Sequence, residues 1–194
     1  TLLNMEKNKN LFVVLMAGGV GVRFWPYSRN SKPKQFLDIL GTGKSLIQAT
    51  YDRFLAICPK ENIIVVTSQE HAELTKQQLP ELTSEQILAE PMRKNTAPCI
   101  AYAAWKIKSK NPDAVMIISP TDHLVLNESD FHEIMIKSFE KAQKQDCLIT
   151  VGIKPTRPET GYGYIQYLES KSPLKKVKTF TEKPDISIAK KFVE

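Results

Sequence analysis

The sequence predicts a three-layer α/β fold: an open, mostly parallel sheet covered by helices on both faces, followed by a smaller β region. Through residue 153, short apolar segments alternate with segments of helical periodicity. The apolar segments are continuous rather than alternating, which is typical of buried parallel strands. From Pro155 onward the segments alternate more and are flanked by glycines. We therefore expect one α/β half over residues 1–154 and the start of a second region over residues 155–194.

Each element of the first part has its own local signal. The first strand is expected at seven consecutive apolar residues, Leu11 to Ala17, and the second at a β-branched run. Ser45 is a plausible N-cap for the first helix, and Pro98 fits the first turn of the third. In order, we expect strands over residues 11–17, 63–66, 86–89, 114–118 and 148–153, and helices over residues 45–57, 69–78, 96–108 and 129–143. The predicted inner face of the third helix consists of Ala97, Ile100, Ala101, Ala104, Trp105 and Ile107.

The second part is shorter and less apolar. Two strands are expected over residues 162–168 and 174–181, and a helix from Asp185. The chain has no starting Met and stops at Glu194 inside this expected helix, so we expect it to be a fragment.

Composition limits the classes of partner. The chain has 194 residues, of which 42% are hydrophobic, and a net charge of +6, which suits an anionic small molecule. Like charges form no block and no Arg-rich aromatic pattern appears, so we expect no nucleic acid as partner. The first apolar run is too short for a membrane span and lacks a signal-peptide cleavage site. Three widely spaced cysteines without a CxxC pair favour a reduced, cytoplasmic chain.

The first strand leads into a glycine-rich, basic loop. Gly18, Gly19 and Gly21 follow the apolar run, and Arg23, Arg29, Lys32 and Lys34 come next. Glycine lets backbone N–H groups approach a ligand closely, and oriented N–H groups beside cations form an anion site. The loop therefore predicts binding of nucleotide phosphates; a glycine turn beside a solvated basic loop is the alternative.

Two standard phosphate-binding motifs fail here. The dinucleotide fingerprint that would start at Gly19 and Gly21 requires a third glycine at the position of Phe24. Residues 41–45, GTGKS, imitate the end of a P-loop, but the first glycine of that motif would fall on Asp38. We interpret residues 41–45 as a loop before a helix and keep a P-loop as the alternative.

Polar residues at the predicted strand ends are the candidates for chemistry, since ligands of open α/β sheets bind beyond the carboxyl ends of the strands. Glu90 ends the third strand and Asp122 follows the fourth. Asp122 is a candidate Mg²⁺ ligand, because Mg²⁺ takes one or two carboxylates together with nucleotide phosphates. The alternative is an Asx-turn or N-cap residue after a proline. Glu182 and Lys183 join an acceptor to a cation, which suits a ligand with hydroxyls and a phosphate, or forms an ordinary surface pair.

Taken together, the motifs resemble the sugar-1-phosphate nucleotidyltransferases. The resemblance rests on GGVGVRFWP at residues 18–26 with the following Ser-Arg and Pro-Lys-Gln. Four further stretches agree in order and spacing: Glu90-Pro91 with Asn95-Thr96-Ala97-Pro98, Pro120-Thr121-Asp122-His123, Thr160 to Ile165, and Thr181-Glu182-Lys183-Pro184. The Trp-Pro, Asn-Thr-Ala-Pro and Asp-His forms are similar to the mannose/guanylyl branch of the family.

This resemblance implies a Rossmann-like fold of the nucleotide-diphospho-sugar transferase type, with a nucleotide-binding half and the start of a sugar-binding region. It implies the reaction of GTP with α-D-mannose 1-phosphate to give GDP-mannose and pyrophosphate, with Mg²⁺ as cofactor. A sugar-phosphate oxygen would attack the α-phosphorus of GTP in line, without a covalent enzyme intermediate, so positioning and charge neutralisation would supply catalysis. The oligomeric state, including a homo-oligomer, stays open.

The resemblance also implies roles for particular residues. Arg23 would stabilise the leaving phosphates, Lys34 would neutralise charge at the α-phosphate, and Asp122 would hold Mg²⁺. The implied nucleotide-binding residues are Gly18, Gly19, Gly21, Glu90, Asn95 and Thr96, with Glu90 as acceptor for the guanine edge. The implied sugar-phosphate residues are Lys183 for the phosphate, and Glu182 and the Gly163 backbone for hydroxyls.

The chain departs from the family pattern in its phosphate loop. Val20 and Val22 stand where the family usually has Ser and Thr, and Phe24 stands in place of Leu. Phosphate binding would therefore rest more on backbone N–H groups and on Arg23 and Lys34. The family's second metal-binding carboxylate would lie beyond Glu194, as would the C-terminal β-helix or isomerase domain that many members carry.

Two other functions stay open. One is a sibling pyrophosphorylase that uses a different sugar 1-phosphate. The other is a non-catalytic homologue that only binds a nucleotide sugar and regulates a partner. Retention of Arg23, Lys34, Asp122 and Lys183 favours an enzyme, since a silent subunit need not keep all four.

Overall fold

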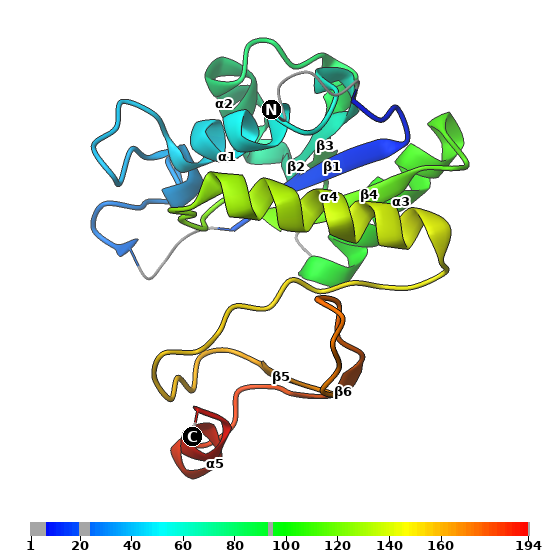
Figure 1. Cartoon of the computed structure of the whole chain (residues 1–194). Coiled ribbons are helices and arrows are strands. Elements are labelled where there is room, and N and C mark those ends of the chain that lie inside the picture. Colours follow the sequence, from blue (N-terminus) through cyan, green and yellow to red (C-terminus); the bar gives the residue numbers. More distant parts are fainter. Residues whose placement is uncertain (1–6, 20–23, 93–94, 194) are drawn as a thin grey trace. The chain divides into compact units, whose positions relative to one another are not determined.

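A computed structural model describes residues 7–19, 24–92 and 95–193, which fall into two compact units, residues 1–145 and 146–194 (Figure 1). The first unit contains β1 (Leu11–Met16), α1 (Leu46–Leu55), β2 (Ile63–Ser68), α2 (Ala72–Gln78), β3 (Ile87–Glu90), α3 (Thr96–Lys110), β4 (Val115–Pro120) and α4 (Glu128–Lys144). Short 3₁₀ turns lie between them, including η3 (Lys34–Phe36). The second unit contains β5 (Tyr164–Tyr167), β6 (Val177–Thr181) and α5 (Ile186–Val193).

The first unit is built on a four-stranded sheet in the order β3-β2-β1-β4. All three strand pairs are parallel, with Val13 opposite Ile63 and Leu11 opposite Val115. The predicted parallel sheet is thus confirmed. The chain moves outward from β1 to β3 and then returns to place β4 on the other side of β1. This reversal makes the carboxyl ends of β1 and β4 the switch point, where ligands of such sheets bind.

Helices cover both faces of this sheet, as the continuous apolar strands predict. Successive residues of a strand point to opposite faces, so Val13 and Leu15 enter one core while Phe12 and Val14 enter the other. Residues of α1 and α4 pack in the first core and residues of α3 in the second. Figure 1 shows α4 crossing in front of the sheet. The central strand is therefore buried on both sides.

The face that α3 buries differs from the prediction. Of the six residues expected on its inner face, only Ile107 is buried, and Trp105 is 75% exposed. The buried stripe is Cys99, Ala103 and Ile107, at intervals of four residues. Alanines occur all around this helix, so its periodicity does not distinguish the two faces. Packing against the Phe12 side of the sheet selects the stripe.

The predicted strand over residues 148–153 is wrong. The structure has no strand between α4 and β5. An apolar, β-branched segment forms a strand only where a neighbouring strand supplies hydrogen-bond partners, and within the second unit only β5 and β6 pair with each other. The sequence pattern shows that the segment favours β structure, but it does not show whether a neighbouring strand is available to pair with it.

The second unit contains the predicted β region. β5 and β6 are antiparallel, with Tyr164 opposite Thr181 and Ile165 opposite Phe180. The register shifts at Gln166 and Tyr167. The expected helix from Asp185 is α5, whose first turn is stabilised by the Asp185 carboxylate, which accepts hydrogen bonds from two backbone N–H groups.

The helices of the first unit are of ordinary length for a globular protein. The longest, α4, has 17 residues, and α3 has 15. Within residues 7–19, 24–92 and 95–193, no helix combines the length and the apolar character that a membrane crossing requires.

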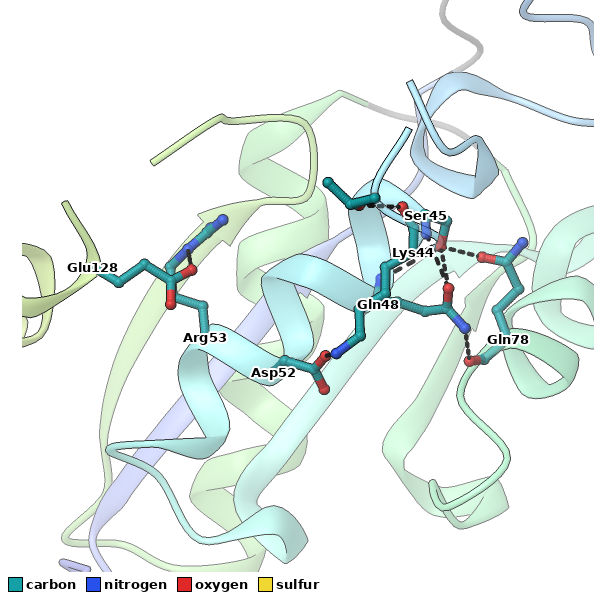
Figure 2. A network of polar contacts seen from close by, with 8 residues as sticks. Lys44, Ser45, Gln48, Asp52, Arg53, Gln78 and Glu128 are labelled. Carbon is teal, nitrogen blue, oxygen red and sulfur yellow. Dashed lines mark hydrogen bonds and ion pairs between the residues drawn. The ribbon is translucent and has the colours of Figure 1, made fainter. Parts of the chain in front are cut away.

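Helix α1 begins at the cap that the sequence predicts. The Ser45 hydroxyl accepts a hydrogen bond from Gln48 N, and the Gln48 side chain accepts one from Ser45 N (Figure 2). Gln48 also donates to the Gln78 carbonyl at 3.0 Å, which ties the start of α1 to the end of α2. At the other end of α1, Arg53 Nε is 3.1 Å from Glu128 Oε1 at the start of α4 (Figure 2).

We expect Ser45→Ala to lower the free energy of unfolding by about 1 kcal/mol, because the variant leaves the first N–H groups of α1 without their acceptor. Urea unfolding measures the change. Ser45→Thr keeps a hydroxyl that can accept from Gln48 N and donate to Gln78 Oε1, and should lose less stability than Ser45→Ala. Equal destabilisation by both substitutions would show that the cap itself is not what stabilises α1.

Candidate active site

The candidate site lies at the carboxyl ends of β1, β3 and β4. Of the predicted residues, Gly18 and Gly19 follow β1, Glu90 is the last residue of β3, and Asp122 follows β4. Lys34 comes from η3, between β1 and α1. Gly21 and Arg23 lie outside the described residues.

Lys34 and Asp122 form an ion pair between the Lys34 ammonium and Asp122 Oδ2. The two residues are 88 positions apart in the chain, and their side chains are 23% and 28% exposed. The Lys34 ammonium also lies 5.9 Å from the centre of the Phe24 ring, within the range of a cation–π contact. A cation and a carboxylate, both partly reachable from solvent, therefore meet at the switch point of the sheet.

Two buried neighbours, one beside each partner of the pair, attach both segments to the end of β1 by hydrogen bonds. Gln35, next to Lys34, is 2% exposed, and its Nε2 donates to Ala17 O at 2.7 Å and to Gly19 O at 3.0 Å. Thr121, next to Asp122, donates from Oγ1 to Met16 O at 3.0 Å. The glycine loop, η3 and the segment after β4 are thereby joined through side chains.

Sequence reasoning quoted Gln35 and Thr121 within motifs but assigned them no role. The available signal was a polar side chain beside each charged candidate, at positions where the strand ends require hydrogen-bond partners. Gln35 is flanked by apolar Phe36, which indicates burial, but only the fold shows that its amide reaches the glycine loop.

Glu90 lies beside the glycine loop and at the edge of an apolar region. A Cβ built on Gly18 would lie 3.7 Å from Glu90 Oε2, so the carboxylate is next to the Gly18 backbone. Burial raises the pKa of Glu90 above its ordinary value, because desolvation disfavours the charged form. Cys99 of α3 is buried nearby, and burial together with the Glu90 charge raises the pKa of its thiol to about 11. Glu90 can accept hydrogen bonds from a ligand, whereas Cys99 stays a neutral thiol.

Asn95 and Thr96 stand at the start of α3, with exposed side chains. Asn95 is the N-cap residue but its side chain makes no capping hydrogen bond. Its backbone has φ of 67° and ψ of −163°, a conformation that is rare outside glycine and costs of order 1–3 kcal/mol. Strained backbone of this kind clusters at ligand sites.

The GTGKS segment satisfies its own hydrogen bonds. Asp38 accepts from Thr42 N at 3.0 Å and from Gly43 N at 2.7 Å, and these backbone bonds, Thr42's first, lower the pKa of Asp38. Lys44 pairs with Asp52 at 2.6 Å (Figure 2). In a P-loop these backbone N–H groups would donate to phosphate, whereas here they donate to the Asp38 carboxylate. The loop interpretation is confirmed and the P-loop alternative is wrong.

The three predicted sugar-phosphate residues meet within the second unit. Gly163 precedes β5 and Glu182 follows β6, so the antiparallel register puts them side by side. A Cβ on Gly163 would lie 2.7 Å from Glu182 Oε2, which shows how closely the carboxylate approaches the glycine backbone. Lys183 Nζ is 2.6 Å from Glu182 Oε1, and both side chains are largely exposed. Lys183 has φ of 42°, in the left-handed region.

The donor set around Asp122 fits a metal that a substrate helps to bind. Among the described residues, no three His, Cys, Asp or Glu side chains gather at one point. Asp122 offers one partly exposed carboxylate that already attracts a cation, and His123 Nε2 is 4.0 Å from Asp122 Oδ1. Mg²⁺ commonly binds one or two carboxylates and takes its remaining ligands from phosphates and water. A single carboxylate fits that pattern and does not fit an all-protein cage.

Open α/β sheets bind their ligands, nucleotides among them, at the switch point, which is where the Lys34–Asp122 pair lies. The family model described as "Nucleotidyl transferase" matches residues 12–194, and the chain belongs to this family.

Named relatives agree with this assignment. The chain is 38% identical over 182 residues to the xanthan biosynthesis protein XanB of Xanthomonas campestris, covering 93% of this chain and 38% of that protein. It is 40% identical over 181 residues to a mannose-1-phosphate guanylyltransferase of Escherichia coli, covering 90% of this chain and 38% of that protein. The chain thus spans about 38% of the length of these curated relatives.

A solved structure is also similar along almost the whole chain. It is described as a mannose-1-phosphate geranyltransferase from Thermus thermophilus. The TM-score is 0.85 at 29% sequence identity, and the match covers 95% of this chain and 53% of that one. The predicted α/β nucleotidyltransferase fold is confirmed.

Proposed function

We propose that the protein transfers GMP from GTP to α-D-mannose 1-phosphate and releases GDP-mannose and pyrophosphate. The observation that carries the proposal is the Lys34–Asp122 pair at the switch point of the sheet. It supplies a cation and a carboxylate where a nucleotide would present its phosphates. The guanylyltransferase name of the E. coli relative supports guanine and mannose 1-phosphate as the substrates.

In the first unit, the proposed roles concern the nucleotide. The Lys34 ammonium neutralises charge that develops at the α-phosphate, and Arg23 does so at the leaving phosphates. Preorganised charge of this kind lowers the barrier of phosphoryl transfer without a covalent step on the enzyme. Glu90 accepts hydrogen bonds from the N1–H and 2-amino groups of guanine. The backbone of Gly18, Gly19 and Gly21, with Asn95 and Thr96, shapes the rest of the nucleotide pocket.

In the second unit, the proposed roles concern the sugar phosphate. Lys183 binds the phosphate of mannose 1-phosphate, and Glu182 and the Gly163 backbone bind sugar hydroxyls. The distances between these three residues support the assignment, because one small ligand can touch all of them.

A divalent metal, which we propose is Mg²⁺ held by Asp122, supplies charge neutralisation at the triphosphate when bound. Thr121 keeps Asp122 at the end of β4 through its hydrogen bond to Met16. The relative named for xanthan biosynthesis supports the use of the product in polysaccharide biosynthesis. We place the protein in the cytoplasm, because its three widely spaced cysteines without a CxxC pair favour a reducing compartment.

Pyrophosphate release tests the proposal. The protein, as its gene encodes it, is supplied with Mg²⁺, GTP and mannose 1-phosphate, and with ATP, UTP, dTTP and glucose 1-phosphate as alternative substrates. We expect release with GTP and mannose 1-phosphate alone. Release with another pair would identify a sibling pyrophosphorylase. Binding of GDP-mannose without release from any pair would identify a regulatory homologue.

Replacing Glu90 with Gln should raise the KM for GTP about tenfold while kcat changes little, because charge-assisted hydrogen bonds to guanine are lost. Steady-state kinetics measure both constants. Glu85→Gln, at an exposed glutamate paired with Lys110, is the matched control. A KM for GTP within about twofold of wild type would contradict the guanine assignment.

The raised pKa of Glu90 adds a pH dependence to this prediction. As the pH falls, Glu90 gains its proton earlier than an exposed glutamate does, so the wild-type KM for GTP should rise, and Glu90→Gln should lack this rise. The same pKa shift affects stability in the opposite direction: a lower pH weakens GTP binding but stabilises the fold. The unfolded chain loses the Glu90 proton at lower pH than the native chain, so the free energy of unfolding falls as pH rises between the two pKa values.

Replacing Gly163 with Ala should raise the KM for mannose 1-phosphate about tenfold and leave the KM for GTP unchanged. The new Cβ would lie 2.7 Å from Glu182 Oε2 and would force that carboxylate away. Gly161→Ala is the control, since its Cβ would lie 3.5 Å from Glu159 Oε1, an ordinary contact. Equal kinetics for the two variants would refute the placement of sugar hydroxyls at Gly163 and Glu182.

A further inference from the structure

We propose that, in the nucleotide-free protein, the Lys34 ammonium pairs with the Asp122 carboxylate in place of the divalent cation. The metal ion and Lys34 therefore compete for this carboxylate until a nucleotide binds. This inference rests on the proposed function, which assigns Asp122 to the metal and Lys34 to the α-phosphate. It adds that Lys34 weakens metal binding at Asp122 in the free protein, and that nucleotide phosphates relieve this opposition.

The geometry of the pair carries the inference. The Lys34 ammonium contacts Asp122 Oδ2 and lies 5.9 Å from the centre of the Phe24 ring. A surface lysine usually samples many rotamers, and a pair of exposed residues is worth little. Here both side chains are less than one-third exposed, and the position of the ammonium is defined by two contacts from different segments.

The backbone on either side of the pair is anchored as well. Gln35 binds the carbonyls of Ala17 and Gly19, and Thr121 binds the carbonyl of Met16, so Lys34 and Asp122 are held against the same end of β1. The pair is therefore a built feature of the site. A shift of either segment would break these hydrogen bonds, whereas rotation of the Lys34 or Asp122 side chain opens the pair and leaves the backbone in place.

The consequence is a coupling between nucleotide and metal. In the free protein a metal at Asp122 must displace an ammonium, which weakens metal binding. A nucleotide phosphate offers the ammonium a stronger acceptor, because charge-assisted hydrogen bonds to phosphate are among the strongest in proteins. Once Lys34 moves to phosphate, the Asp122 oxygen is open to a cation that the same phosphates also bind. Affinity coupling of this kind is reciprocal, so metal at Asp122 also favours the phosphate-bound position of Lys34.

Binding of Mn²⁺ to the nucleotide-free protein, followed by electron paramagnetic resonance, tests this competition without any measurement of turnover. Lys34→Met removes the ammonium and keeps an unbranched apolar side chain beside Phe24. We expect the Kd for Mn²⁺ to fall about fivefold in this variant, the size expected for loss of a partly exposed ion pair. Lys34→Arg keeps the positive charge at the carboxylate and should bind Mn²⁺ as weakly as the wild type.

Two further variants serve as controls. One tests whether any lost positive charge has the same effect as loss of the Lys34 contact, and the other tests whether the metal binds at Asp122. Lys32→Met removes one positive charge two residues away, from an exposed side chain, and should leave the Kd unchanged. Asp122→Asn in the Lys34→Met background should abolish the gain in affinity. Equal Kd values for Lys34→Met and Lys32→Met would overturn the competition. A gain that survives Asp122→Asn would instead overturn the assignment of the metal to Asp122, and with it that part of the proposed function.

Discussion

Replacing Asp122 with Asn is expected to lower kcat for GDP-mannose synthesis by about 10³-fold, the order seen when preorganised charge is removed from a transition state. The amide cannot supply the negative charge that the proposed metal requires, and it leaves Lys34 without its ion-pair partner. Asp122 is partly exposed and its backbone stays tied to β1 through Thr121. The fold should therefore remain intact.

Pyrophosphate release measures this loss, and circular dichroism with urea unfolding checks the fold. Asp113→Asn is the matched control, since Asp113 is an exposed aspartate just before the opposite end of β4. The control should keep full activity. An Asp122→Asn variant with kcat within about threefold of wild type would show that Asp122 holds neither the metal nor the transition-state charge.

Replacing Gln35 with Leu is expected to lower kcat about 100-fold, because displacement of a catalytic loop by about 1 Å has effects of this size. Gln35 is almost fully buried and donates to Ala17 O and Gly19 O, at the start of the proposed phosphate loop. Leucine fills a similar volume but leaves both carbonyls without this donor. A lost buried hydrogen bond costs about 1–3 kcal/mol, so the free energy of unfolding should also fall.

Gln48→Leu is the control that distinguishes loss of loop positioning from a general loss of protein stability. Gln48 also caps backbone with its side chain, donating to Gln78 O at 3.0 Å, but it lies at the start of α1 and in no proposed binding role. Both variants should lose stability in urea, and only Gln35→Leu should lose kcat. If kcat at saturating substrate is the same in the two variants, Gln35 contributes to folding alone and does not position the loop.

The sequence by itself determined the features that depend on local pattern. Continuous apolar runs specify the parallel strands β1, β2 and β4, and helical periodicity specifies the helices between them. Ser45 with Gln48 specifies the start of α1, because a cap requires only residues three positions apart. The order of strand-end residues also predicted that Gly18, Glu90 and Asp122 stand at the carboxyl edge of one sheet.

Only the tertiary structure decided which side chains meet. The partner of Asp122 is 88 residues away, and the local pattern offers four cations in one loop, Arg23, Arg29, Lys32 and Lys34. The same limit explains the errors. The buried stripe of α3 depends on the sheet that it packs against, and a strand over residues 148–153 requires a neighbour. Local pattern sets the tendency of a segment, whereas contacts between distant segments are selected by packing and by hydrogen-bond satisfaction across the whole fold.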